Sequence, residues 1–118
     1  MKKYVFNERD TLVNLSHPFL VKFYYAFQSK NKLFLVHEFC ENGDLEHYLF
    51  REKTLKEPVA RICIAEIILA LEYLHENNII YRDLKPSNVV IDEEGHVKLT
   101  DFGLAKEIFQ NKTFTFCG

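Results

Sequence analysis

Hydrophobic and polar residues alternate with different periods along the chain, and the first third predicts one helix followed by a β-hairpin. Residues 3–15 carry apolar positions at helical spacing among charged ones, and this helix should end before Pro18. Residues 20–27 alternate as a strand does, and a polar turn at 28–32 separates them from a continuously apolar strand at 33–36. The alternation places four residues of the first strand on one face, namely Val21, Phe23, Tyr25 and Phe27.

The middle of the chain has the longer period of helices. A polar connector at 41–44 interrupts the pattern, and a short amphipathic helix is expected at 45–50. A long helix is expected from Pro58 to Asn77, because a proline in the first turn loses no hydrogen bond there. Apolar residues cover nearly its whole circumference, which predicts burial on several sides. Any side left uncovered would be prone to association.

A second hairpin is predicted where the apolar runs 89–91 and 97–99 flank a four-residue turn that ends in Gly95. We expect Ile91 to lie opposite His96 across this turn. The polar residues that precede the first strand and follow the second would then meet at the same end of the hairpin.

Asn88 and Asp101 are the polar residues in question. In the expected register Asn88 lies opposite Leu99, and Asp101 follows that partner by two residues, about 7 Å along a strand. Amide and carboxylate oxygens at an open strand end suit Mg²⁺, which prefers oxygen ligands and keeps water for a phosphate. The two side chains are therefore candidate metal ligands.

Composition and charge narrow the class of protein. The 118 residues are 47% hydrophobic and 27% charged with a net charge of −2, which fits a folded domain and gives no electrostatic reason to expect nucleic acid as a partner. No signal peptide or membrane span is indicated. Cys40, Cys63 and Cys117 form no C-x-x-C pair, so we expect a reducing compartment, namely the cytoplasm with the nucleus as a second location.

The segment 81–88, Tyr-Arg-Asp-Leu-Lys-Pro-Ser-Asn, immediately precedes the second hairpin. Asp83 is able to accept a proton from an attacking hydroxyl, and Lys85 to neutralise charge on a transferring phosphoryl group. Each residue alone would be interpreted as an ordinary turn residue before a strand. Their combination, followed by a hairpin and by Asp-Phe-Gly at 101–103, matches in order the catalytic and metal-binding signatures of protein kinases.

The chain resembles the AGC group of eukaryotic serine/threonine protein kinases, and within it the ribosomal-protein and protein-kinase-B branches. Tyr-Arg-Asp-Leu-Lys-Pro is typical of that group, and the likeness runs from about residue 7 to residue 118. Three further segments carry it: 17–21, 95–104 and 113–118.

This resemblance implies an α+β, bilobal protein-kinase-like fold of which the chain holds a part. Residues 1–38 would be a small-lobe remnant, 39–43 the hinge, and 44–118 the large lobe up to the activation loop. The family's Gly-rich phosphate loop and strand lysine would precede Glu8, and its A-P-E segment would follow Gly118. We therefore expect a fragment of an active kinase, inactive by itself. The alternative is a non-catalytic kinase-like binding or scaffold module, or a truncated gene product without activity.

The activity implied by the resemblance is Mg²⁺-dependent transfer of the ATP γ-phosphoryl group to serine or threonine of a protein substrate. Asp83 would orient and deprotonate the substrate hydroxyl, and Lys85 would contact the γ-phosphate. Asn88 and Asp101 would hold the Mg²⁺ ions.

Nucleotide contacts and interlobe packing are implied in the same way. Glu38 and Cys40, in the connector between the lobes, would offer backbone groups to the adenine of ATP. Glu8 matches the helix glutamate that pairs with the ATP-contacting strand lysine. Four residues match the stack of apolar side chains that couples the lobes: Leu12, Phe23, Tyr81 and Phe102.

Regulation by phosphorylation is implied at Thr115, which matches the activation-loop site and calls for an upstream activating kinase. A phosphate there would add nearly two negative charges, for which Arg82 and Lys106 are the expected partners.

Three positions bear on specificity. Ser87 stands where AGC kinases usually have a glutamate that helps to recognise a basic substrate residue. Asp44 keeps an acidic group at another recognition position, so a weakened preference for arginine upstream of the target is expected. His37 occupies the gatekeeper position beside the adenine pocket, an unusual choice. None of these departures removes a catalytic group.

Overall fold

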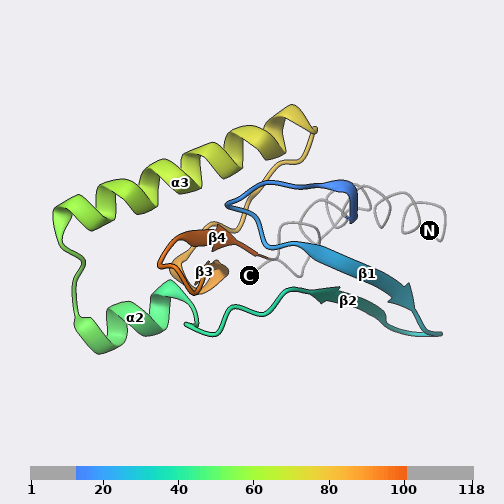
Figure 1. Cartoon of the computed structure of the whole chain (residues 1–118). Helices are drawn as coiled ribbons and strands as arrows, with labels where there is room; N and C mark the ends of the chain where they lie inside the picture. Colours follow the sequence, from blue (N-terminus) through green and yellow to red (C-terminus); the bar gives the residue numbers. More distant parts are fainter. Residues whose placement is uncertain (1–12, 101–118) are drawn as a thin grey trace.

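The computed structural model describes residues 13–100. Most of the predicted first helix lies outside this range, and the two of its residues that open the described range, Val13 and Asn14, are helical. The elements that follow confirm the predicted kinds and order (Figure 1): β1 Phe23–Gln28, β2 Leu33–His37, α2 Leu45–Glu52, α3 Glu57–Glu76, the 3₁₀ helix η1 Pro86–Asn88, β3 Val89–Ile91 and β4 Val97–Leu99. Among residues 13–100, no helix has the length and apolar character needed to cross a bilayer.

The β1–β2 hairpin is antiparallel and contains an irregularity. Phe23 pairs with His37, but the register shifts between Phe23 and Tyr25, so one extra residue is accommodated in β1. Phe23 is 2% exposed, whereas Tyr25 is 67% exposed. An inserted residue inverts the alternation of side chains beyond it. The prediction that Val21, Phe23, Tyr25 and Phe27 share one face is therefore wrong beyond this point.

The α2 helix begins and ends with local capping interactions. Asp44 precedes it in extended conformation and accepts a hydrogen bond from the His47 amide at 2.8 Å. At the other end Lys53 adopts a left-handed conformation, with φ of 73°, and its amide donates to the Leu49 carbonyl at 2.8 Å.

The α3 helix buries one narrow stripe and exposes the rest of its apolar surface. The stripe packs on the β3–β4 hairpin. Its buried residues follow helical spacing: Cys63, Glu66, Ala70 and Leu74. Large apolar side chains are exposed on the other sides, so the predicted burial on several sides is not found within residues 13–100: Ile62, Ile64, Ile68 and Leu69.

The β3–β4 hairpin pairs one residue out of the predicted register. Ile91 lies opposite Val97, and Val89 lies opposite Leu99. The turn is shorter than predicted because Asp92 is still paired with His96, its amide donating to the His96 carbonyl at 2.8 Å. Gly95, with φ of 91°, closes the resulting three-residue loop in a conformation that glycine adopts without strain.

This hairpin lies at the centre of the described structure, between α3 and α2 (Figure 1). Backbone bonds hold both of its sides: the Leu99 amide donates to the Phe19 carbonyl at 2.9 Å, and the Ile91 amide to the Gly43 carbonyl at 2.8 Å. The buried core gathers around it: Leu15, Leu20, Phe23, Cys63, Ala70, Leu74, Ile79, Val89, Val97 and Leu99.

Candidate active site

Three predicted site residues, Asp83, Lys85 and Asn88, are brought together by the turn that precedes β3. The turn is η1, which starts at Pro86, and the Asn88 amide donates to the Lys85 carbonyl at 2.9 Å. Asn88 Nδ2 donates to the Asp83 carbonyl oxygen at 2.9 Å and lies 3.4 Å from Asp83 Oδ2. Lys85 Nζ lies 3.4 Å from the same Oδ2. The turn thus gathers a carboxylate, an ammonium group and a carboxamide.

The side chain of Asp83 is anchored through one oxygen only. Oδ2 faces Lys85 and Asn88, and Oδ1 has no hydrogen-bond partner within residues 13–100. The Asp83 side chain is 32% exposed, so a ligand from solvent is able to reach it. This geometry is suited to accepting a proton from a hydroxyl group placed at Oδ1.

Asn88 lies opposite Thr100 at the end of the hairpin, since the Thr100 amide donates to the Asn88 carbonyl at 3.0 Å. The observed register therefore leaves Asp101, which is outside the described residues, one position beyond the partner of Asn88. Both Asn88 and Thr100 are 7% exposed. The Tyr81 hydroxyl donates to the Thr100 carbonyl at 2.8 Å, which fixes this end of β4 to the start of the segment 81–88, here named the catalytic turn after its predicted catalytic residues.

The donor set at this strand end fits a hard cation. The Nδ2 group of Asn88 donates to Asp83, so the amide oxygen of Asn88 remains available to bind a cation. Amide and carboxylate oxygens are the ligands that Mg²⁺ prefers. Between residues 13 and 100 there is no group of three or more His, Cys, Asp or Glu side chains that could hold a metal ion. A metal site here therefore depends on the amide of Asn88 and on acidic residues next to it.

Glu38, which precedes the predicted hinge, is held by its backbone and its side chain. Its amide donates to the Lys22 carbonyl at 2.9 Å, and its Oε1 accepts from the Lys22 amide at 2.9 Å. His37 Nδ1 donates to the Glu38 carbonyl at 2.8 Å, and the His37 ring packs edge-on against Phe23 with centroids 5.4 Å apart. The carbonyl predicted to face adenine thus already accepts a hydrogen bond from His37, the predicted gatekeeper.

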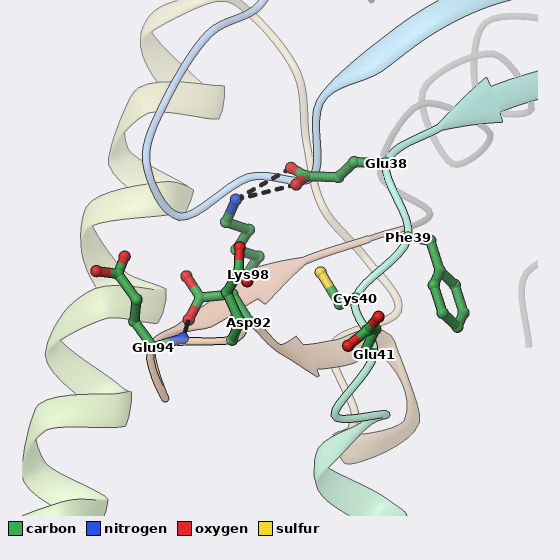
Figure 2. A pocket seen from close by; sticks show the side chains of 8 residues that line it. Glu38, Phe39, Cys40, Glu41, Asp92, Glu94 and Lys98 are labelled. Atoms are coloured by element: carbon green, nitrogen blue, oxygen red, sulfur yellow. Dashed lines mark hydrogen bonds and ion pairs between the residues drawn. The ribbon is translucent and has the colours of Figure 1, made fainter.

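Glu38 also forms an ion pair with Lys98 of β4, with Nζ 3.1 Å from Oε1 and 3.3 Å from Oε2 (Figure 2). Burial opposes the charge of Lys98, but the hydrogen bond and charge of Glu38 outweigh it and raise the Lys98 pKa. For Cys40, partial burial and the nearby Glu38 raise the thiol pKa, which makes it a poor nucleophile.

A cavity of about 290 Å³ lies between the hinge and the β3–β4 turn (Figure 2). Of the predicted site residues only Glu38 and Cys40 line it, so it does not include the catalytic turn. Its lining is mainly acidic: Glu38, Phe39, Cys40, Glu41, Asp92, Glu93, Glu94 and Lys98.

The remaining predicted residues are distributed as follows. Asp44 caps α2, and its carboxylate also contacts His47 Nδ1 at 2.9 Å. Arg82 is exposed, next to Asp83. Others lie outside the described residues: Glu8, Leu12, Asp101, Phe102, Lys106 and Thr115.

Two contacts near the site escape prediction from the sequence. Lys98 lies between apolar residues on β4, a pattern that places it on the face away from the core, but nothing local identifies Glu38 as its partner. Glu66 of α3 accepts hydrogen bonds from His96 and from the Val97 amide. A single glutamate within an apolar helical stripe indicates a hydrogen-bonding partner for its buried carboxylate, but the sequence does not identify that partner.

Comparison with known proteins places these residues in a wider context. The protein kinase domain family matches residues 1–118. Ribosomal protein S6 kinase alpha-3 of Homo sapiens is 51% identical over 113 residues, which cover 94% of this chain and 15% of that protein. Protein kinase 2 of Dictyostelium discoideum is 50% identical over 113 residues, 95% of this chain and 24% of that protein. The chain thus spans less than a quarter of the length of these relatives.

Proposed function

Because the chain belongs to the protein kinase domain family, we propose that it supplies the phosphoryl-transfer centre of an AGC-type serine/threonine kinase. The family predicted from the sequence is confirmed, and so is its ribosomal-protein kinase branch. Kinases of this family use ATP and Mg²⁺ and act on protein substrates. The proposal for this chain is that its own residues perform that reaction on serine or threonine hydroxyls.

The observation that carries the proposal is the arrangement of Asp83, Lys85 and Asn88 around one turn. Asp83 would receive the proton of the substrate hydroxyl on Oδ1, while Oδ2 stays anchored. Lys85 would move its ammonium group from Asp83 to the γ-phosphate, which its side chain, 41% exposed, is able to reach from the solvent side. A binding module would not need all three groups in this geometry, which favours catalysis over the scaffold alternative.

Asn88 would hold Mg²⁺ through its amide oxygen, together with Asp101. When bound, the cation would neutralise the phosphate charges and keep the transferred group in line. The pairing of Asn88 with Thr100 and the Tyr81–Thr100 bond support this role, because they fix the strand end where both ligands would lie.

ATP would bind along the hinge through the Glu38 carbonyl and the Cys40 amide. The Cys40 amide has no hydrogen-bond partner among residues 13–100, which suits it to donate to adenine. The Glu38 carbonyl already accepts from His37, so adenine would have to share or displace this contact.

The proposal extends to regulation by phosphorylation, to substrate preference and to location in the cell. Thr115 would receive a phosphate from an upstream kinase, with Arg82 and Lys106 as partners, and Glu8 would pair with an ATP-contacting lysine. Asp44 would add a weak preference for arginine upstream of the target residue. Protein substrates of this kind fit a location in the cytoplasm, with the nucleus as a second compartment.

The test is a chimaera in which this chain replaces its matching residues in human ribosomal protein S6 kinase alpha-3. We expect Mg²⁺-dependent transfer of labelled phosphate from ATP to a serine peptide. Asp83→Asn should lower kcat roughly a hundredfold to ten-thousandfold, because the general base is lost. Glu76→Gln, at the exposed end of α3, serves as the matched control and should leave kcat unchanged.

A chimaera that unfolds at the same temperature as its parent kinase but transfers no phosphate would contradict the proposal, as would an active Asp83→Asn variant. The isolated 118-residue chain is expected to show no measurable transfer in the same assay.

A further inference from the structure

Glu66 of α3 is the only charged residue that is buried among residues 13–100, and both oxygens of its carboxylate are used. Oε1 accepts a hydrogen bond from the Val97 amide at 3.0 Å, and Oε2 accepts one from His96 Nδ1 at 2.5 Å. His96 and Val97 are the residues with which the chain leaves the turn and enters β4. One side chain of α3 therefore holds the hairpin at its turn end, and these two bonds offset the cost of burying its charge.

His96 is the solvent-facing member of the pair. Its side chain is 50% exposed, whereas that of Glu66 is 8% exposed. Protons can therefore reach the imidazole from water without any opening of the core. On its other side the His96 ring packs against Phe19, with ring centroids 6.0 Å apart.

The charged groups around His96 all favour its protonated form. The hydrogen bond and the negative charge of Glu66 raise the His96 pKa above its ordinary value, and partial loss of hydration opposes them weakly. Asp92, which pairs with His96, and Glu94, in the loop between them, add to the increase. Within residues 13–100, the charges that act on the ring are those of Glu66, Asp92 and Glu94, and the segment before β1 contributes the uncharged ring of Phe19.

We propose that Glu66 and protonated His96 form a pH-dependent latch that holds the β3–β4 turn against α3. A histidine whose pKa is raised in the folded state stabilises that state fully below the ordinary histidine pKa. The stabilisation is lost as the pH rises through the pKa of the folded state. Above that point neutral His96 can still donate from Nδ1, but the bond is no longer charge-assisted and the latch loosens.

Loosening should be confined to the turn end of the hairpin. Beyond it, β4 is bonded to Phe19 and β3 to Gly43 through backbone groups that do not titrate in this range. The Val97 amide, which donates to Glu66, is the group that should respond. This latch goes beyond phosphoryl transfer and does not depend on it, so either proposal can fail without the other.

The experiment uses NMR on the 118-residue chain between about pH 5.5 and pH 8.5, the range in which histidine titrates. The His96 ring should titrate above the ordinary histidine value. Protection of the Val97 amide from hydrogen exchange, corrected for the intrinsic pH dependence of exchange, should fall roughly fivefold as His96 deprotonates. A His96 ring that titrates at the ordinary value in the unmodified chain would overturn the proposal.

Glu66→Gln separates the two bonds, because its amide oxygen still accepts from Val97 while the charge is gone. In this variant the His96 titration should move toward the ordinary value, and the pH dependence of Val97 protection should disappear. Glu94→Gln is the matched control, since it removes a smaller charge contribution near the same ring without removing a hydrogen bond. It should lower the His96 titration far less than Glu66→Gln does and should keep the pH dependence of Val97 protection. Equal His96 titrations in Glu66→Gln and the unmodified chain would refute the latch.

A second variant covers the case in which Glu66→Gln does not fold. His96→Phe keeps an aromatic ring against Phe19 but removes the proton-binding group. Its Val97 protection should show no dependence on pH after the same correction. Persistence of the fivefold change in this variant would assign the effect to another group and overturn the proposal.

Discussion

The carboxylate of Asp44 makes two kinds of contact at the position where the predicted hinge ends and α2 begins. It caps the helix by accepting from the His47 amide, and it also contacts the His47 ring. Partial burial works against its charge, but the hydrogen bonds from His47 outweigh this and lower the Asp44 pKa. A carboxyl group whose pKa is lowered by folding stabilises the folded state above its ordinary pKa, and this stabilisation is lost as the pH falls through the lowered value.

We expect Asp44→Ala to lower the free energy of unfolding by about 1 kcal/mol at neutral pH, because the first turn of α2 loses its cap. Asp44→Asn should retain most of that stability, since asparagine is also a good cap. The measurement is urea denaturation followed by circular dichroism. The difference between the unmodified chain and Asp44→Asn should vanish in acid, and a difference that grows as the pH falls would contradict this interpretation.

At the scale of elements, the register of the β3–β4 hairpin is decided by its turn. Asp92 Oδ1 accepts from the amides of Glu94 and His96, both at 2.9 Å, and Gly95 completes the loop with a positive φ. These contacts keep Asp92 in the hairpin and so shift every pair by one residue from the predicted register. The position of Asn88 opposite Thr100 is a direct result.

Gly95→Ala should destabilise the chain by about 1 kcal/mol, because an alanine side chain disfavours a φ of 91° even though no atom lies within 4 Å of the added carbon. Glu93→Ala is the control in the same turn, where φ is negative, and should have little effect. Thermal unfolding monitored by circular dichroism compares the two. Equal melting temperatures would mean that the turn does not need its left-handed residue.

Periodicity is sufficient to predict both hairpins and both helices closely, including α3, expected at 58–77 and found at Glu57–Glu76. Periodicity does not predict the extra residue in β1 or the β3–β4 register. The order of polar and apolar residues along each strand is the same in both registers, whereas a shift of one residue changes the cross-strand partner of every residue. The catalytic turn is predictable because its residues are contiguous. The Glu38–Lys98 and Glu66–His96 pairs are not, because each joins segments far apart in the chain.

At the scale of the whole molecule, α3 differs from an ordinary surface helix because several of its large apolar side chains are exposed. Ile62, Ile64 and Ile68 are each more than half exposed along a single helix. Ile64 and Ile68 lie one helical turn apart and form an exposed apolar pair, while Ile62 lies on another side of the helix. Exposed apolar surface of this kind promotes association in water. The feature follows from a helix that is apolar nearly all round but buries one stripe.

The chain is therefore expected to self-associate at micromolar concentrations, and the double variant Ile64→Glu/Ile68→Glu should shift it toward the monomer. Both positions are exposed, so the folded structure should be retained. Sedimentation velocity over a concentration series gives the measurement. Thr54→Glu/Asn31→Glu, at exposed positions outside α3, adds the same two negative charges and serves as the control. A monomeric unmodified chain would show that this surface does not drive association.

The backbone bridge between Leu20 and Leu99 has a kinetic consequence. It joins residues near the two ends of the described chain, with the Val21 amide donating to the Leu99 carbonyl at 3.0 Å. Such a contact forms only after the intervening chain has closed into a loop, which costs entropy before any bond is gained. The β-hairpins and α3 can form from local contacts, so the joining of residues 20–21 to β4 should be the slow step of folding. In the same step Lys22 and Lys98, both of which bind Glu38, come together.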